Sequence, residues 1–212
     1  MYYPIKTPWL FRKIYSKYTW HIDTPEPLLY LTFDDGPHPE VTPFVLDELK
    51  KHNAKATFFC IGKNVVQYPD IYKRILDEGH RTGNHTFNHL NGWSTPDDTY
   101  INDILKAKQF IDSSLFRPPY GKITRFQAKV LMAENKTFQS MFRIIMWDIL
   151  SGDFDTSKTG DDCVMNVVPN VRNGSIITFH DSEKAWSRLS VALPVVLETL
   201  TEKNYRFDAL SF

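Results

Sequence analysis

The sequence predicts a single-domain α/β protein built around a parallel sheet. Short apolar runs with the length of buried strands alternate with longer segments that carry apolar residues at helical spacing. The 212 residues, 42% hydrophobic and 14% aromatic, are enough for one sizeable core. Polar side chains of chemical interest follow the apolar runs, and in parallel α/β folds ligands bind at that end of the strands. Periodicity alone leaves open whether the sheet is flat and doubly wound or curled into a barrel.

The expected elements fill most of the chain after residue 27. In residues 39–53, Val41, Val45 and Leu49 fall on one face of a helix, and the other expected helices show similar apolar spacing. We expect strands at residues 28–33, 56–61, 81–85, 115–118, 142–147, 175–180 and 206–210, and helices at residues 39–53, 68–80, 95–113 and 187–204. The chain shows no internal repeat and no linker that would divide it.

The charge balance and the cysteine content exclude some classes of partner and of covalent cross-link. Lys plus Arg and Asp plus Glu both total 25, so the formal net charge is zero, and we expect no nucleic-acid partner. Uncharged sugars remain compatible with such a surface. Cys60 and Cys163 stand far apart with no CxxC spacing, so a disulfide framework is not expected. Nothing in the composition predicts the oligomeric state.

The N-terminal residues 1–27 differ from the rest in being aromatic and mildly basic. We expect this segment to pack on a domain that spans residues 28–212; a membrane-surface helix or a partner-binding helix is the alternative interpretation. The segment has no continuous apolar core of the secretory kind, and the chain has no apolar run near the ~20 residues that a transmembrane helix needs. We therefore expect a cytoplasmic protein without a transmembrane segment.

Two adjacent carboxylates, Asp34 and Asp35, end the first expected strand in the sequence TFDDGP. At a strand end the chain turns, so both side chains can reach one site. Two other interpretations are a turn with a helix-capping aspartate and a magnesium-dependent phosphate-transfer site.

A histidine pair favours a different metal. His85 and His89 stand four residues apart in HTFNH, and imidazole ligands favour zinc or a similar transition metal over magnesium. Two histidines plus one aspartate leave coordination positions open, which is typical of a catalytic zinc site. Thr86 occupies the place of the glutamate of the HExxH protease motif, so that chemistry is not expected.

Four motifs in order resemble the polysaccharide deacetylase family, also called the NodB homology domain or carbohydrate esterase family 4. They are TFDDGP, HTFNH, RPPYG at 117–121 and IITFHD at 176–181, and they span nearly the whole chain after residue 27. The resemblance implies a distorted, incomplete (β/α)7-type barrel, related to a TIM barrel, in a single domain. It also implies a hydrolase that removes acetyl groups from carbohydrates.

The resemblance assigns roles to the motif residues. It implies that Asp35, His85 and His89 bind a divalent metal, which we expect to be zinc, with cobalt and nickel as alternatives. Asp34 is then the general base for the attacking water, and Arg117 orients that carboxylate by charge pairing. The backbone N–H of Tyr120 would help to hold the oxyanion. His180 would protonate the leaving amine.

Two positions depart from the family pattern. The family's Asp-Trp pair falls on Asp153 and Phe154, so the aspartate expected to pair with His180 is present but an indole N–H is lost; Asp148 is the competing partner. The family usually has leucine two residues before the last histidine, where it lines the pocket for the acetate methyl, and this chain has Thr178. A hydroxyl at this position makes the pocket less apolar, which predicts either a different acyl group or a repacked pocket.

These residues lead to the hypothesis of a metal-dependent hydrolase that removes N-acetyl groups from an acetylated sugar or polysaccharide. The alternatives are an O-acetyl sugar esterase or another non-peptide amide hydrolase with the same site, and, more remotely, an inactive sugar-binding protein. Asp34, Arg117 and His180 are all present, which favours an active enzyme.

Overall fold

The computed structural model describes residues 3–133 and 142–212. Over these residues a parallel sheet follows the order β5-β4-β3-β2-β1-β7-β6, and β8 pairs with β1 beside this path. The strands are β1 (Leu28–Asp34), β2 (Ala56–Cys60), β3 (Arg81–Asn84), β4 (Leu115–Phe116), β5 (Arg143–Ile144), β6 (Ile149–Leu150), β7 (Ile176–His180) and β8 (Arg206–Phe207). The sheet curls without closing, so the predicted incomplete (β/α)7-type barrel in one domain is confirmed.

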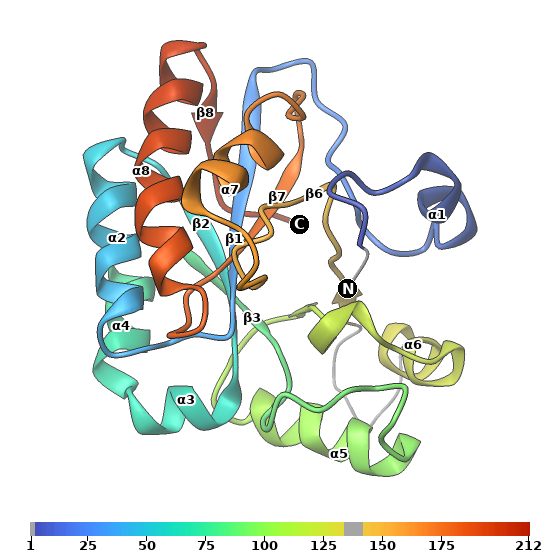
Figure 1. Ribbon diagram of the computed structural model, residues 1–212. Coiled ribbons are helices and arrows are strands. Elements are labelled where there is room, and N and C mark those ends of the chain that lie inside the picture. The colour runs from blue at the N-terminus through green and yellow to red at the C-terminus, as the bar shows by residue number, and fades with distance from the viewer. Residues whose placement is uncertain (1–2, 134–141) are drawn as a thin grey trace.

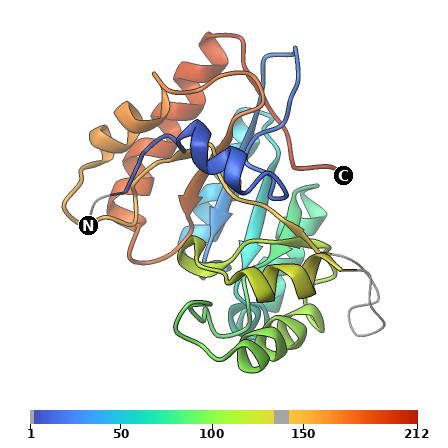
Figure 2. The ribbon, with the colours of Figure 1, turned by 90° about the vertical axis from the view of Figure 1, so that its right-hand side faces the viewer.

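Helices cover the outside of the curled sheet. α2, α4 and α8 lie along one side, α3 and α5 lie near the carboxyl ends of the strands, and α1 and α6 lie on the opposite side, where they face the viewer in Figure 2. Their bounds are α1 (Trp9–Ile14), α2 (Val41–Lys51), α3 (Gly62–Gln67), α4 (Pro69–Asp77), α5 (Asp97–Lys108), α6 (Arg125–Met132), α7 (Gly160–Val167) and α8 (Trp186–Glu202), with a 3₁₀ turn, η1, at Pro119–Gly121.

The seven expected strands all appear, and the sheet contains one more. Strand β6 begins two residues after the expected strand at 142–147, with only Asp148 between them, so the sequence offered no turn that would separate the two strands. Four helices also escaped the sequence patterns, namely α1, α3, α6 and α7. These four are six to eight residues long, too short for a helical repeat to stand out.

The side chains of β1 point alternately into the main core and into the hollow of the half-barrel. Leu29, Leu31 and Phe33 point outward into the main core, which α2 and α8 also fill. The alternate residues, Thr32 and Asp34, therefore point into the hollow of the half-barrel. Strand β7 pairs with β1 in parallel register and repeats this division, so that Thr178 and His180 share the inner face with Thr32 and Asp34.

The N-terminal segment runs along the open side of the half-barrel. Lys6 bridges to Ile149 of β6, and Thr19 bridges to Ile145, which directly follows β5. The segment thus contacts both ends of the sheet path, where a closed barrel would have its missing pairing. Residues 1–2 lie outside the described part, and the division of the chain at residue 27 stays a prediction.

Within the described residues, no helix is long and apolar enough to cross a membrane.

Candidate active site

The carboxyl ends of the strands collect the expected site residues. Asp34 ends β1 and His180 ends β7, and the two residues are partners in the register of the sheet. His85 directly follows β3, and Arg117 directly follows β4. Side chains separated by up to about 150 positions in sequence therefore meet at one edge, because parallel strands bring their carboxyl ends together.

Asp35, His85 and His89 form one group that could hold a metal ion. One potential ligand atom from each lies within 4.8 Å of the others. Oδ1 of Asp35 is 3.1 Å from Nε2 of His89 and 3.7 Å from Nε2 of His85. The same oxygen is buried and receives no well-formed hydrogen bond from the described residues. A buried anionic oxygen that faces two imidazole nitrogens fits a divalent cation.

The backbone of this group is strained in the way that functional sites often are. Asp35 has φ 83° and His89 has φ 59°, both in the left-handed region that costs a non-glycine residue of the order of 1 kcal/mol or more. The turn after Asp35 is also tightly enclosed. A Cβ on Gly36 would lie 2.0 Å from a carboxylate oxygen of Asp181, so only glycine fits there.

The imidazole of His85 is prepared to act as a neutral ligand. Its Nδ1 donates to the backbone carbonyl of Arg117 at 2.7 Å, which leaves the lone pair of Nε2 directed toward Asp35. Burial lowers the pKa of His85 to about 4, against the opposing charge of Asp34. Burial opposes the charge of Asp35, but the contact with His89 and the neighbouring histidines prevail and lower its pKa. Both shifts favour the protonation states that metal ligands need.

Arg117 is completely buried and holds Asp34 from below. One of its terminal nitrogens, Nη1, donates to Asp34 Oδ1 at 2.7 Å and to Thr32 Oγ1 at 2.7 Å. The rest of the guanidinium donates to the backbone carbonyls of Ile145 and Met146, at 3.2 and 2.9 Å. The guanidinium also stacks 4.1 Å from the ring centre of Phe59. A carboxylate fixed in this way stays ionised and correctly placed.

His180 pairs with Asp153 and not with Asp148. Nδ1 of His180 lies 2.8 Å from Asp153 Oδ1, and its backbone N–H donates to Oδ2 at 2.7 Å. Burial works against a charged imidazole here, but the charge and hydrogen bond of Asp153 outweigh it and raise the pKa of His180 to about 9. Asp148 is instead paired with Arg12 at 2.9 Å and accepts from Ser175. The competing assignment for Asp148 is therefore wrong.

Two aromatic side chains border the site. The Tyr120 ring is exposed and lies 4.7 Å from the ring of His89, at a residue with φ 60° in the turn η1. The Phe154 ring contacts the His180 ring edge-on at 5.2 Å, so the aromatic packing expected of this position is present. The role of the Tyr120 N–H toward an oxyanion stays a prediction.

Thr178 does not reach the surface of the site. It is 1% exposed, and its hydroxyl lies 3.1 Å from that of Thr32, which itself accepts from Arg117. The residue expected to line an acyl pocket thus belongs, in this structure, to the buried hydrogen-bonded network under Asp34.

Two residues at the site, Asp181 and Tyr3, have no role that the sequence motifs predict. Asp181 accepts from the Gly36 N–H at 3.0 Å and from the Thr42 hydroxyl at 2.6 Å, which ties the end of β7 to the turn that carries Asp35. Burial and the nearby charge of Asp35 raise the pKa of Asp181 to about 8. Its place next to His180 in TFHD was the available signal. Tyr3 has no such signal, because it meets Phe154 only through the fold.

Comparison with known proteins supports the family that the sequence motifs resemble. The sequence model of the family described as polysaccharide deacetylase matches residues 21–137, more than half of the chain. A peptidoglycan-N-acetylglucosamine deacetylase of Bacillus cereus is 37% identical over 199 residues, which cover 91% of each chain.

The chain belongs to the polysaccharide deacetylase family.

Solved structures of this deacetylase family share its fold. The Bc1960 peptidoglycan N-acetylglucosamine deacetylase, in a crystal structure with 4-naphthalen-1-yl-N-oxidanyl-benzamide, superposes with a TM-score of 0.84 at 35% identity and covers 96% of this chain and 95% of that one. The peptidoglycan deacetylase PdaC from Bacillus subtilis reaches a TM-score of 0.76 at 28% identity, with coverage of 89% and 90%. The deacetylase described here is thus a carbohydrate deacetylase, a hydrolase that acts on non-peptide carbon–nitrogen bonds.

Proposed function

We propose that this deacetylase removes the acetyl group from N-acetylglucosamine units of peptidoglycan, with zinc held by Asp35, His85 and His89. The observation that carries the proposal is the co-location of three groups at one sheet edge. These are the metal-binding triad, the Asp34–Arg117 pair and the Asp153–His180 pair. The named relative in Bacillus cereus, 37% identical over 91% of each chain, supports the substrate.

Asp35, His85 and His89 would hold a divalent cation, which would supply a Lewis acid for the acetamide carbonyl and would lower the pKa of a bound water. Two proton transfers are then assigned to residues of the chain. Arg117 occupies Oδ1 of Asp34, so we assign proton uptake from the attacking water to Oδ2 of Asp34. His180, kept protonated by Asp153, delivers a proton to the leaving amine nitrogen. An amide needs that second transfer, because without it the C–N bond would have to break by releasing an amide anion, which is a poor leaving group, whereas the protonated nitrogen leaves as a neutral amine.

The test is acetate release from purified peptidoglycan and from a soluble N-acetylglucosamine oligomer. Each is measured before chelation, after chelation and after zinc, cobalt or nickel is restored. We expect activity that disappears with the metal and returns best with zinc. His89→Gln is expected to prevent the recovery, whereas His52→Gln, a change beyond the end of α2, is the matched control that recovers.

Three results would count against the proposal. Activity that persists under chelation would remove the metal from the mechanism. Faster turnover of an O-acetylated than of an N-acetylated sugar would favour the esterase alternative. A metal-loaded protein without turnover of any acylated sugar would favour the inactive sugar-binding alternative.

A cytoplasmic location stays a prediction, for which fractionation of the native cells is the measurement.

A further inference from the structure

Helix α1 exposes several large apolar side chains. Its six residues, WLFRKI, include no buried one. Trp9 is 70% exposed, Leu10 50%, Phe11 52% and Ile14 57%. Isolated exposed apolar residues are ordinary, but four large ones on one and a half turns of helix form a patch, and such patches mark interaction surfaces. We call these four residues the α1 patch.

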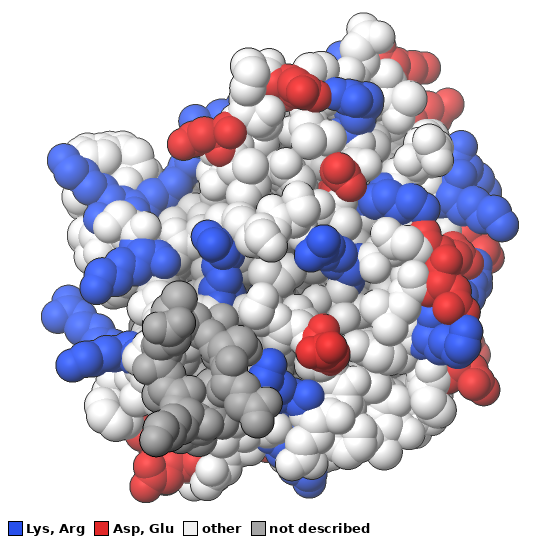
Figure 3. All heavy atoms as spheres, turned by 180° about the vertical axis from the view of Figure 1, so that it is seen from behind, with Lys and Arg blue, Asp and Glu red and all other residues white. Residues whose placement is uncertain are grey.

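The α1 patch lies in a part of the chain whose charged residues are all basic. The first 22 residues contain Lys6, Arg12, Lys13 and Lys17 but no aspartate or glutamate, although the whole chain is neutral. Lys13 lies over the ring of Trp9, with its Nζ 5.8 Å from the ring centre. Seen from behind, Lys and Arg side chains gather on the side of the molecule that carries α1 (Figure 3).

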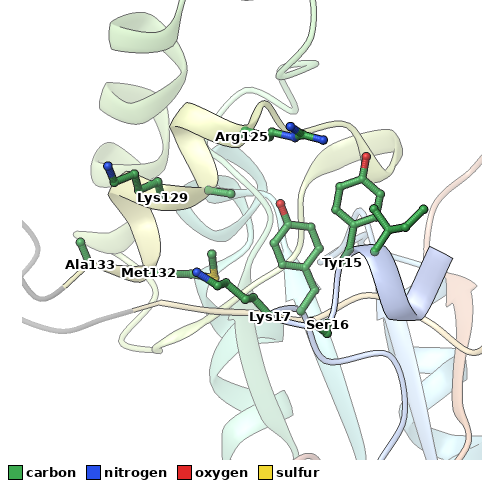
Figure 4. A pocket seen from close by; sticks show the side chains of 10 residues that line it. Tyr15, Ser16, Lys17, Arg125, Lys129, Met132 and Ala133 are labelled. Carbon is green, nitrogen blue, oxygen red and sulfur yellow. The ribbon is translucent and has the colours of Figure 1, made fainter. Parts of the chain in front are cut away.

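Two hollows continue this basic surface on either side of the segment that follows α1. One, of about 610 Å³, lies between that segment and α6, and its charged lining residues are Lys17, Arg125 and Lys129 (Figure 4). The other, of about 440 Å³, has Arg12, Arg143 and Arg172 in its lining, with Asp23 as its acidic residue. Arg12 and Arg172 both pair with the buried Asp148, so two cations share one carboxylate there. The surface around the α1 patch is therefore suited to anionic groups.

Contacts to the body of the protein hold helix α1 in place. Arg12 pairs with the buried carboxylate of Asp148 at 2.9 Å and donates to the carbonyl of Thr7. The rings of Phe11, Tyr15, Tyr18 and Trp20 form a continuous series with centres 5.6–6.4 Å apart, which leads from the exposed helix into the core. Figure 1 shows the result, in which α1 stands out from the sheet on the side away from α2 and α8. The apolar side chains are thus presented outward rather than left loose.

We propose that the α1 patch and the basic residues around it bind the surface of a bilayer that contains anionic lipids. Tryptophan and phenylalanine enter the interfacial region of a bilayer, and neighbouring lysines attract anionic headgroups. A six-residue helix is about 9 Å long, so it lies on the surface and does not span the ~30 Å hydrocarbon core. This inference goes beyond the deacetylation chemistry and does not depend on it.

Charge distinguishes the bilayer from other occupants. A second copy of the chain, related by two-fold symmetry, would place the same cations opposite one another around the patch. A soluble polyanion would pair with Lys13 and Lys17 but would leave Trp9 and Phe11 in water. An anionic bilayer is complementary to both the charged and the apolar side chains.

The experiment is flotation of the full chain with vesicles of phosphatidylcholine, made with or without an equal part of phosphatidylglycerol. We expect binding to the anionic vesicles and little to the neutral ones. Trp9→Ser and Phe11→Ser should each weaken binding about tenfold through lost apolar burial. Lys13→Gln with Lys17→Gln should weaken it about 30-fold. Met165→Ser on α7, and Lys50→Gln with Lys203→Gln on the far side, are matched controls that should bind like the parent chain.

All variants are first checked by circular dichroism and by acetate release from a soluble substrate. Each should keep the parent's spectrum and its rate of acetate release. Three results would overturn the inference. These are failure to float with anionic vesicles, flotation that the α1 variants do not alter, and binding of inorganic polyphosphate in place of vesicles. Sedimentation velocity provides a further check, because a dimer that Trp9→Ser dissociates would assign the patch to a second copy of the chain.

Discussion

Arg117 links the proposed general base, Asp34, to the buried residues that fix its position. A guanidinium with no exposed surface meets a carboxylate, a hydroxyl, two backbone carbonyls and an aromatic face. A buried charge is tolerated only when its donors are satisfied, and here four acceptors from two parts of the chain do so. The position of Asp34 is therefore set by residues of β1, by the segment after β5 and by Arg117 itself.

Arg117→Lys tests this dependence. An ammonium keeps the charge but cannot reproduce the planar fork, so some of the four acceptors lose their donor. We expect acetate release to fall about 100-fold and the free energy of unfolding to fall by about 2 kcal/mol. Urea unfolding and initial rates measure the two effects. Arg172→Lys, in a half-exposed ion pair with Asp148, is the matched control and should change neither quantity appreciably.

The pairing of His180 with Asp153 predicts the high-pH limit of activity. A general acid must carry its proton, and a pKa raised to about 9 keeps His180 protonated until the pH approaches that value. Asp153→Asn removes the charge that raises the pKa and leaves the burial that lowers it. The descending limb of kcat/KM against pH should move to lower pH by about 1–3 units.

Asp148→Asn is the control for that experiment. Asp148 is as buried as Asp153 but pairs with Arg12, so its replacement should affect stability and leave the descending limb in place. An equal shift in both variants would mean that the limb does not report His180.

Among the elements, the loop after β6 depends on a distant part of the chain. Tyr3 packs its ring 4.9 Å from the ring of Phe154 and donates its hydroxyl to Asp155 at 3.0 Å. Phe154 in turn contacts His180. The N-terminal segment therefore supports the loop that carries Asp153, the partner of the proposed acid.

Tyr3→Ala should lower kcat/KM about three- to tenfold, since a ring pair contributes about 0.5–1.5 kcal/mol beyond its buried area. Tyr3→Phe keeps the ring and loses only the hydroxyl, so it should retain most of the activity. Tyr205→Ala, a half-buried tyrosine packed against the main core, serves as the control for a general loss of packing. Equal losses of kcat/KM in Tyr3→Ala and Tyr205→Ala at equal stability would exclude a specific role for Tyr3.

The sequence predicts strongly those elements that repeat a pattern or end in a motif. β1 and β7 combine an apolar run with a polar terminus, so both the strands and their terminal residues could be identified. Helices α6 and α7 could also have been found, because Thr124 with Gln127 and Thr159 with Asp162 each form a capping box. Strand β6 could not, because only Asp148 separates it from the expected strand at residues 142–147, and no turn residue marks the start of a second strand.

At the scale of the whole molecule, the unpredicted features are contacts between remote segments. The Thr178 hydroxyl meets Thr32 across 146 positions of sequence, and Tyr3 meets Asp155 across 152. Neither contact leaves a local signal, since each depends on how the sheet curls and on which segment covers its open side. A resemblance to a family assigns a residue to a motif, but only the packing shows that Thr178 lies under Asp34 and not beside a substrate.

Metal binding should stabilise the whole domain, because its expected ligands join segments that follow different strands. Asp35 follows β1, whereas His85 and His89 follow β3, and the left-handed backbone at Asp35 and His89 costs energy that bound zinc would offset. Zinc at about 1,000 times its dissociation constant should raise the free energy of unfolding by about 4 kcal/mol, or the melting temperature by about 10 °C. Asp35→Asn, whose amide tolerates the same φ, should fold without metal and lose this response, while Asp70→Asn on the surface of α4 should keep it. Differential scanning calorimetry with and without zinc measures the difference, and an equal rise in parent and Asp35→Asn would place the stabilising zinc elsewhere on the protein.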